Sequence, residues 1–521
     1  MTEGADQLPE LARDAGWRHL DLRMLLVHPV NELVRFLPLV VGVFVLGRSG
    51  EGDPWHYLGV AVPIVLGLWR FVSTSFRITG SQIELRRGLV GRRVLTAPLD
   101  RVRTVELTAS PIHRLLGLAK VEIGTGSGAR SGDDGLVLDS LGMAEARRLR
   151  ADLLHRAPLA PAVAGTGQEA VGQDSAGHDA AGQDAVGAAS APPDERVIVR
   201  LDPGWARYAP LTTSGLVIAL AALGGSSQFL GNVIDRAATS SSVDERVGAL
   251  PLVVSVPLGI AVFLVAISTL AVSGYLLANW GFTLSRDGSG GSFHVRRGLL
   301  TTRETSIDVG RLRGVEIHEP LGLRLAGGGR LTAIVTGLGR RAEGSTALVP
   351  PAPRSVVVGV GEQVLGEAGP LSAPLTPHGP AARRRRYLRA LVSTSAVPLV
   401  LAGLWLVAAW PAWPAILTLV LPGAGLWLAR DRYAGLGHAL TERHLVVRAG
   451  SFQGRRDVLA RTGIIGWNLR QTYFQRRAGL VTLIATTAAG KQAYQALDIP
   501  ESTAIALADA AVPDLMGQFV E

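Results

Sequence analysis

The chain contains no cysteine and carries little charge for its length. Of its 521 residues, 18% are charged and 47% are hydrophobic. Without cysteine there is no disulfide framework, no thiolate metal site and no cysteine nucleophile. Soluble proteins usually carry nearer a quarter charged residues. The low charge and the positive mean hydropathy therefore predict an integral membrane protein.

Signatures of catalysis are also absent from the sequence. Its eleven histidines are scattered, and no His-Glu-x-x-His motif occurs. Gly124–Gly128 resembles a phosphate-binding loop but lacks the Lys-Ser/Thr that follows in such loops. His113, His318 and Glu319 fall near the ends of expected strands, and we interpret them as surface residues. We predict no catalytic residue, no metal, no cofactor and no enzymatic activity.

The first residues do not form a secretory signal. Met1–Val27 is mixed and charged, without a basic start followed by an apolar core. Residues 1–32 are therefore predicted to be a cytoplasmic N-terminal segment.

Long apolar segments are present, and they come in pairs. A spanning helix needs about 20 apolar residues, which the last four segments can supply and the first two cannot. We predict three membrane hairpins, over residues 33–72, 209–279 and 388–429; whether the first spans the bilayer is left open. The apolar segments are Leu33–Leu46, Tyr57–Val72, Leu211–Ile234, Leu250–Ala278, Leu391–Trp410 and Ala412–Leu428.

The net charge of +9 comes almost wholly from arginine, and its placement predicts the orientation. Arginines cluster at the ends of the segments that adjoin the termini and the linkers, as the positive-inside rule expects of cytoplasmic ends. Both termini should therefore face the cytoplasm of a multi-pass protein of the cell membrane. A run of four is the expected membrane anchor: Arg383, Arg384, Arg385 and Arg386.

One passage occurs three times, each time after an apolar pair. The copies are Ile83–Arg93, Phe293–Arg303 and Leu445–Arg455. A repeat of long period sets the architecture of a chain. Each copy has a glycine that we expect to supply a positive φ in a turn (Gly88, Gly298, Gly450), then an arginine (Arg101, Arg311, Arg461) and a second glycine 29 residues past the first (Gly117, Gly327, Gly479).

Short alternating segments follow each hairpin and end in a stretch with helical spacing. This pattern predicts about seven strands and one C-terminal helix, a small antiparallel barrel-like sheet capped by a helix. The modules should span residues 73–156, 281–367 and 432–519. Residues 157–195, rich in Ala, Gly, Gln and Asp, are predicted to be a disordered linker. The Pro-rich stretch within 368–387 is expected to be a similar linker.

These motifs resemble the bacterial pleckstrin-homology-like (PH-like) membrane proteins of the DUF304 type. The matching pieces include Phe76–Thr79, Leu85–Gly88, Asp100–Val102 and Gly117-Leu118. The resemblance implies an integral membrane α + β fold, with three repeats of a transmembrane helical hairpin followed by a small antiparallel PH-like β-barrel with a C-terminal helix. The second copy departs most, with Gly288–Ser292 inserted in its first turn.

Arginines around each repeated turn are the candidate contacts to a lipid or protein partner. Strand-end guanidinium groups converge on one rim and hold phosphate through paired donors. Positive-inside charge and protection of an edge strand would explain the same residues without a ligand. The candidates are Arg86, Arg87, Arg92, Arg93, Arg296, Arg297, Arg303, Arg448, Arg455 and Arg456.

Three functions are compatible with this sequence. The first is a non-enzymatic membrane scaffold whose PH-like modules bind membrane lipids, another membrane protein or a second copy, and no nucleic acid. The second is a component of a transport or export system linked to envelope stress. An enzyme acting on lipid is the third, and no acid–base cluster supports it.

Overall fold

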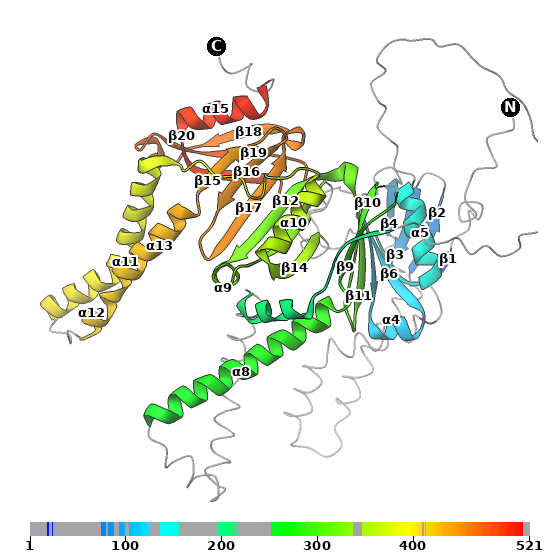
Figure 1. Cartoon of the computed structure of the whole chain (residues 1–521), viewed down its shortest axis with the longest axis horizontal. Coiled ribbons are helices and arrows are strands. Elements are labelled where there is room, and N and C mark those ends of the chain that lie inside the picture. The colour runs from blue at the N-terminus through cyan, green and yellow to red at the C-terminus, as the bar shows by residue number, and fades with distance from the viewer. Residues whose placement is uncertain are drawn as a thin grey trace, which may run out of the picture. The chain divides into compact units, whose positions relative to one another are not determined.

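A computed structural model describes residues 18–19, 23, 74–79, 82–87, 93–98, 104–124, 136–155, 195–212, 215, 252–288, 290–336, 346–408, 411 and 413–513. The first predicted hairpin, most of the 157–195 linker and most of the first helix predicted at 209–279 lie outside these residues. The chain divides into two compact units, which are described separately (Figure 1). Unit 1 comprises residues 1–125, 129–197 and 285–294, and unit 2 comprises residues 126–128, 198–284 and 295–521.

In unit 1, the first copy consists of two half-sheets stacked over one core. β2 pairs antiparallel with β3, and β3 with β4; β5 pairs with β6, and β6 with β7. Phe76, Ile83 and Leu85 of one half-sheet share a buried cluster with residues of the other half-sheet. The elements are β2 (Thr74–Ile78), β3 (Gln82–Arg87), β4 (Arg93–Pro98), β5 (Thr104–Ala109), α4 (Pro111–Leu115), β6 (Leu118–Gly124), β7 (Leu136–Gly142) and α5 (Met143–His155).

The second copy has the same order of elements and ends on a helix, as the sequence predicts for each module. Its first strands are neighbours in the order β11-β10-β9-β8, and the division between the units runs through β8, β9 and β10 themselves. The elements are β8 (Arg196–Arg200), β9 (Thr283–Arg286), β10 (Ser292–Arg297), β11 (Thr302–Asp308), β12 (Leu312–Pro320), α9 (Leu321–Leu325), β13 (Gly328–Val335), β14 (Ala347–Pro353) and α10 (Arg354–Leu365).

The third copy repeats that order again in unit 2. Leu445, Val447 and Leu459 of its first half-sheet pack on Val481, Leu483 and Ile499 of its second, with Ala504 and Leu507 of the C-terminal helix. The elements are β15 (Gly437–Leu440), β16 (His444–Ala449), β17 (Gln453–Ala460), β18 (Gly466–Arg470), α14 (Tyr473–Arg476), β19 (Leu480–Thr486), β20 (Ala493–Pro500) and α15 (Glu501–Ala511).

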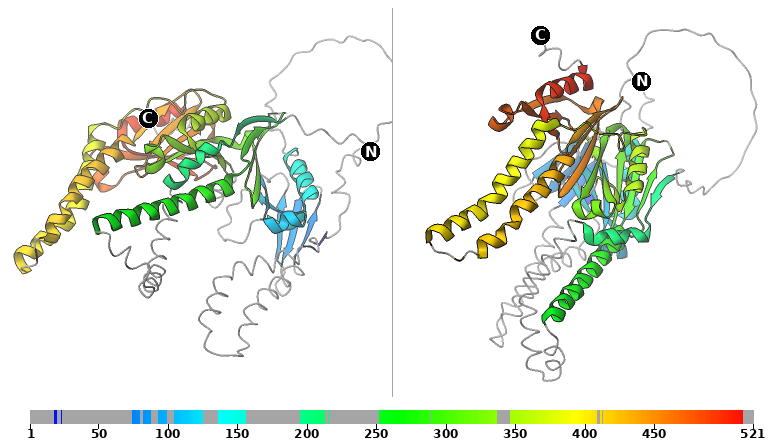
Figure 2. Two further views of the ribbon diagram at one scale, coloured as in Figure 1. Left: turned by 60° about the horizontal axis from the view of Figure 1, so that its bottom comes forward. Right: turned by 60° about the vertical axis from the view of Figure 1, so that its left-hand side comes forward.

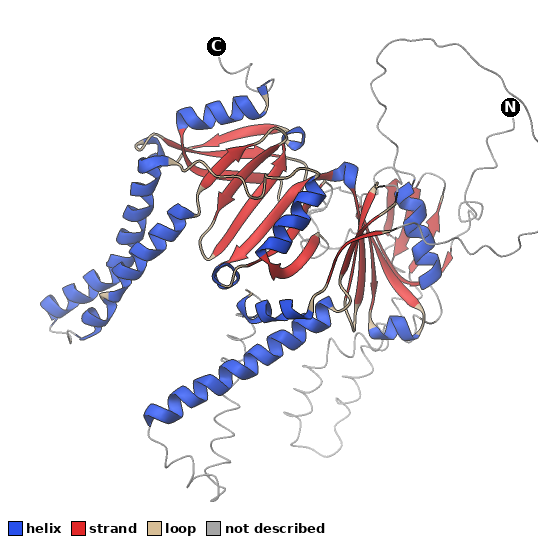
Figure 3. Cartoon of the chain, in the orientation of Figure 1, coloured by secondary structure: helices blue, strands red, loops and turns tan. Residues whose placement is uncertain are grey.

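Copies two and three share a sheet, so neither folds as a separate barrel. β12 pairs antiparallel with β17 from Gly314↔Leu459 to Pro320↔Gln453, which we call the seam. The result is a six-stranded sheet in the order β14-β13-β12-β17-β16-β15, in which β12 and β17 lie side by side (Figure 3). The sheets are antiparallel as expected, but the described strands form no closed barrel. The first strand of the second copy's second half-sheet, β12, thus takes its neighbour from the third copy.

A strand N-terminal to each predicted hairpin completes the sheet that follows the hairpin. β1 (Arg18–His19) pairs with β2, β8 neighbours β9, and Thr376 forms a bridge with His438 of β15. Seven strands for each of the first two copies were therefore expected correctly, but their placement was not. The predicted membrane segments therefore lie between the first strand of each sheet and the strands that follow. From the sequence they were expected before all the strands.

The stretch predicted as the second linker, 368–387, has defined structure. Leu371 is fully buried, and His378 Nδ1 lies 2.7 Å from the Leu497 carbonyl oxygen. α11 (Gly379–Ala408) begins within it. Proline-rich composition suggested a free linker, but Pro374 and Pro377 flank the bridge to β15, an edge position where a missing N–H group costs little, and Pro380 lies in the first turn of α11.

Two described helices are long and apolar enough to cross a membrane: Pro257–Asn279, within α8 (Leu252–Asn279), and α11. α11 packs with α12 (Trp413–Thr418) and α13 (Val420–Ala434) as a hairpin. α8 and the hairpin extend away from the strands of unit 2 (Figure 2). Their apolar side chains are exposed; Val265 is 66% and Val400 63% accessible.

The predicted positive φ of the turn glycines is confirmed at two positions. Gly298 has φ +107° and Gly450 has φ +102°, whereas Gly88 lies outside the described residues. A Cβ on either would fall 2.0 Å from a backbone oxygen, of Thr301 or Gln453. These turns therefore require glycine for both conformation and space.

Replacing Gly450 with alanine should destabilise the third copy. Backbone strain alone costs about 1–3 kcal/mol, and the clash with the Gln453 oxygen adds to it. Gly359→Ala in α10 is the control, because its Cβ would meet nothing within 4 Å; it should be neutral or stabilising by about 0.5–1 kcal/mol. Thermal unfolding of the purified variants measures both, and equal melting temperatures would contradict the assignment.

Candidate functional site

The repeated basic turn of the second copy lies against the end of α8. The Gly298 N–H donates to the Trp280 carbonyl oxygen, and the Leu299 N–H donates to that of Leu277, both at 2.9 Å. The last carbonyls of a helix have no partner within the helix, so the turn satisfies two of them. The repeat passage is thereby fixed at the exit of the predicted membrane segment.

The turn of the third copy occupies the same place on α13. Ser451 Oγ donates to Asp431 Oδ2 at 2.6 Å. The carbonyl oxygen of Gly450 approaches Gly435, the residue after α13, so closely that a Cβ there would be 2.2 Å away. Both described turns thus join the helix that leads into their own copy.

Exposed apolar side chains form the tips of these turns, and arginines flank them. Trp280, Leu300 and Phe452 are 53%, 54% and 54% exposed. Arg296 and Arg303 are exposed on the strands beside the first tip, with Arg296 Nε 3.6 Å from Glu304 Oε1. Apolar tips between basic residues at a helix exit are typical of a membrane interface. We call the two described turns, with their flanking arginines, the juxtahelical turns.

The predicted arginines differ in their surroundings. Arg448 and Arg455 are half-buried beside the third copy's turn, with Arg455 Nε 3.4 Å from Asp457 Oδ2. Arg456 is buried and donates to the Leu371 and Ala373 carbonyls, so it holds the pre-helix segment against the sheet. Arg297 is half-buried on β10 and Arg86 half-buried on β3; Arg87 of β3 stands opposite Arg93 of β4, and Arg92 lies outside the described residues.

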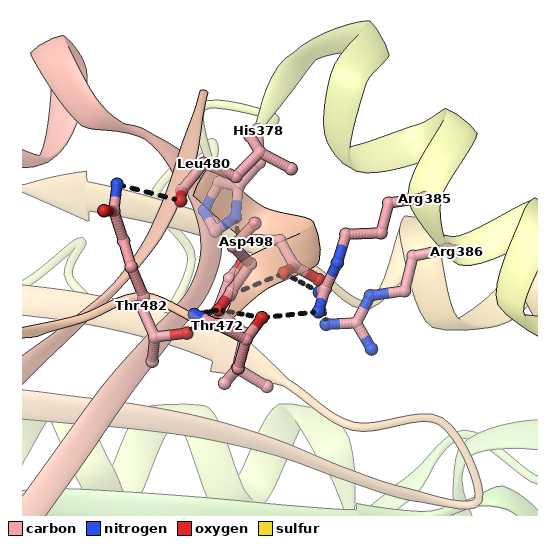
Figure 4. Close-up of polar contacts among 10 residues, drawn as sticks. His378, Arg385, Arg386, Thr472, Leu480, Thr482 and Asp498 are labelled. Carbon is pink, nitrogen blue, oxygen red and sulfur yellow. Dashed lines mark hydrogen bonds and ion pairs between the residues drawn. The ribbon is translucent and has the colours of Figure 1, made fainter. Parts of the chain in front are cut away.

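The predicted anchor run divides into two pairs. Arg383 and Arg384 are exposed, while Arg385 and Arg386 turn inward to Asp498 of β20 (Figure 4). Asp498 is 1% exposed; Oδ1 accepts from Arg385, and Oδ2 lies 2.6 Å from Arg386 Nη2. Gln475 Nε2 also donates to Asp498 Oδ1 at 2.9 Å. This ion triad fixes the start of α11 to the second half-sheet of the third copy.

The other helix of this hairpin is fixed to the second copy. Asp431 of α13 receives Arg324 Nη2 of α9 at 2.5 Å as well as the Ser451 hydroxyl. Charged contacts therefore fix both helices of the hairpin at their sheet-side ends, one to each copy.

Two carboxylates lie opposite each other in the middle of the seam. Glu316 and Asp457 are directly paired and are 4% and 2% exposed. Like charges in that position destabilise a sheet. Lys491 Nζ is 2.6 Å from Glu316 Oε1, so its charge compensates that of Glu316, and His318 Nε2 lies 3.3 Å from the same oxygen. Within the described residues, neither oxygen of Asp457 has a hydrogen-bond partner.

Burial, and then repulsion by Glu316, raise the pKa of Asp457 to about 7. Burial lowers the pKa of His318 to about 4 despite the attraction of Glu316. The surroundings thus keep His318 neutral near neutral pH and shift the titration of Asp457 from acidic to near-neutral pH. The stability of the seam should therefore depend on pH.

The repeated arginine after the turn has a structural role in the third copy. Arg461 donates to the carbonyls of Ala510 and Ala511 at the end of α15, and to that of Glu442. A cation there also suits the negative end of a helix. In the second copy Arg311 instead lies 3.3 Å from Asp308, and Arg101 lies outside the described residues. A cavity of about 640 Å³ adjoins Arg461, at the end of the seam near Gly314.

Comparison with known proteins agrees with the repeat for two of the three copies. Residues 32–157 and residues 393–511 match the bacterial PH domain family. The first match includes the whole predicted hairpin and the module after it, and the second includes most of both. The second copy is outside both matches, as its departures in sequence suggest. No curated protein and no solved structure matches the chain.

Several buried polar residues that hold the structure together were not identified from the sequence. His113 and Glu319 were interpreted as surface residues, but they are 5% and 6% exposed, so that interpretation is wrong. Glu319 lies on β12, which would be an exposed edge if the copy stood alone; the seam buries it. Asp498, Glu316 and Lys491 were missed because the residues of each ion pair are more than a hundred positions apart in the sequence. Asp498 pairs with Arg385 and Arg386, and Glu316 pairs with Lys491.

Removing the acid of the ion triad should destabilise the junction strongly. Asp498→Ala leaves two largely buried guanidinium groups without their partner, which costs about 3–5 kcal/mol. Arg383→Gln with Arg384→Gln is the matched control, since both side chains are exposed. Protease resistance of the α11 start and thermal unfolding report the loss. If the control destabilised the protein as much as Asp498→Ala, the ion triad would not be what fixes the start of α11 to the sheet.

Asparagine at position 457 should make the stability less dependent on pH. The folded pKa of Asp457, about 7, lies above its ordinary value of 3.8, so its contribution is full below pH 3.8 and lost as pH rises toward 7. Asp457→Asn should therefore raise the melting temperature relative to the parent more at pH 8 than at pH 5. Exposed Asp509→Asn is the control. An identical shift at both pH values would show that Asp457 does not titrate in this range.

Proposed function

We propose that this protein is a membrane-anchored, non-enzymatic scaffold whose PH-like modules bind anionic lipid head groups at the cytoplasmic face of the cell membrane. Its two matched regions resemble domains that generally bind and do not catalyse. The observation that carries the proposal is the position of the juxtahelical turns. Each described turn, with apolar tip and flanking arginines, hydrogen-bonds or packs against the end of an apolar helix.

Exposure of the apolar helices supports membrane anchoring. A helix whose side chains are apolar and accessible all round needs a lipid or protein environment. The exits of α8 and α13 would then lie at the head groups, together with Trp280 and the turn tips. Arginines beside these tips would meet phosphate groups through paired N–H donors. The proposed topology places the termini and all three modules in the cytoplasm.

A transport or export component is the alternative function. Transport pathways usually place ionisable or polar groups inside the membrane. Pro257–Asn279 of α8 contains no charged residue, and the charges of α11 lie in its first turns. These features favour anchoring over transport.

Cysteine probes can test the position of the turns, because the chain has no cysteine of its own. Leu300→Cys carrying an environment-sensitive dye should shift to the blue in vesicles containing phosphatidylglycerol, whereas the same dye at exposed Thr462→Cys should not. Leu264→Cys in α8 should resist a membrane-impermeant maleimide. Equal spectra at positions 300 and 462, or rapid labelling at 264, would contradict anchoring.

Lipid selectivity has a separate readout. Arg296→Gln with Arg303→Gln should weaken phosphatidylglycerol retention in native mass spectrometry roughly five-fold per arginine, from about 1 kcal/mol per basic residue near an anionic surface. Arg313→Gln with Arg443→Gln, which changes charge away from the turns, should leave it unchanged. Should both double variants retain lipid like the parent while a co-purifying protein is lost from the first, the partner would be a protein instead of a lipid.

A further inference from the structure

Two of the end strands in the described sheets, β18 and β4, correspond to the two strands of the seam. β18 is one end strand of the sheet β18-β19-β20, and β4 is one end strand of β1-β2-β3-β4. Such edges offer a row of N–H and C=O groups to another strand, and proteins usually protect them. Here they carry exposed apolar side chains: Val94 is 51%, Leu469 39% and Ile465, just before β18, 63% exposed.

Comparison of the repeat copies shows that β18 corresponds to β12 and β4 corresponds to β17, the two strands of the seam. Gly466 of β18 and Gly314 of β12 each precede the second repeat glycine by thirteen residues, and a short helix follows both strands. β4 and β17 are also equivalent, because their turns pair Arg87↔Arg93 and Ala449↔Arg455, the same number of residues apart. β18 is thus a β12-type edge, and β4 is a β17-type edge.

In the seam these two edge types pair with each other over seven residues. The contact is head-to-tail, joining the second half of one copy to the first half of the next. A heterologous contact of this type leaves one unpaired edge at each end of the array, so a further copy can be added there. The third copy ends the chain with the β12-type edge, and the first copy begins it with the β17-type edge.

We infer that β18 of one molecule pairs antiparallel with β4 of a second molecule, so that the protein assembles head to tail through a seam between chains. Transferring the register of the seam places Leu469 opposite Val94 and Trp467 opposite Thr96, as Ile317 stands opposite Arg456 and Val315 opposite Val458. Arg470 would face Arg93, where His318 faces Arg455 in the chain's own seam. The inference rests on the strand edges and does not depend on lipid binding.

Crosslinking between two differently tagged chains tests this contact directly. One chain carries Leu469→Cys and the other Val94→Cys, both exposed positions at which a substitution should not unfold the protein. After co-expression and mild oxidation or treatment with a short bismaleimide, we expect a species of about twice 54.8 kDa containing both tags. Each variant alone should give at least ten-fold less.

Leu95→Cys in place of Val94→Cys is the matched control. Its side chain points to the opposite face of β4 toward the core, so crosslinking to Leu469→Cys should fall at least ten-fold. Leu469→Lys should also shift the purified protein toward monomer in light scattering.

Three results would overturn the inference. One is the absence of a mixed-tag product while a monomeric mass persists at micromolar concentration. The second is equal crosslinking at positions 94 and 95. In the third, a single chain bearing both cysteines crosslinks efficiently without gaining mass and the mixed chains do not, which would mean that the chain closes on itself.

Discussion

The seam between β12 and β17 is the contact on which unit 2 depends. It supplies the missing neighbour of two edge strands at once, buries Val315 against Val458, and brings Glu316 and Asp457 together away from water. The strands of a buried ladder cannot easily shift or separate, because each unpaired buried backbone group costs as much free energy as a lost hydrogen bond. The carboxylate pair is therefore held in place by the surrounding ladder, with Lys491 reducing its cost.

Charge placement links this seam to the hairpin formed by α11 and α13. Asp498 receives arginines from the first helix, and Asp431 receives an arginine from α9 and a hydroxyl from the turn. Buried ion pairs add little net stability compared with apolar packing, but they penalise any other arrangement strongly. Their contribution here is geometric: they set the angle at which the helices leave the sheets, and with it where the juxtahelical turns point.

Local patterns predicted the elements well and their connections poorly. The C-terminal helix expected of each module is present as α5, α10 and α15, and the positive φ expected of the turn glycines is found at Gly298 and Gly450. Pairing between copies was not predictable, because β12 and β17 look like ordinary edge strands of separate modules. The roles of Arg385 and Arg456 were hidden for the same reason: their partners, Asp498 and the carbonyls of Leu371 and Ala373, come together only through the fold.

The seam also has a consequence for synthesis, because its two strands are made at different times. β12 leaves the ribosome about 130 residues ahead of β17, and at about 5–20 residues per second this is a wait of roughly 7 to 26 seconds. All of α11, α12 and α13 is synthesised within that interval. Until β17 is made, the second copy presents the unpaired edge of β12, which is the kind of strand edge that proteins usually protect from association.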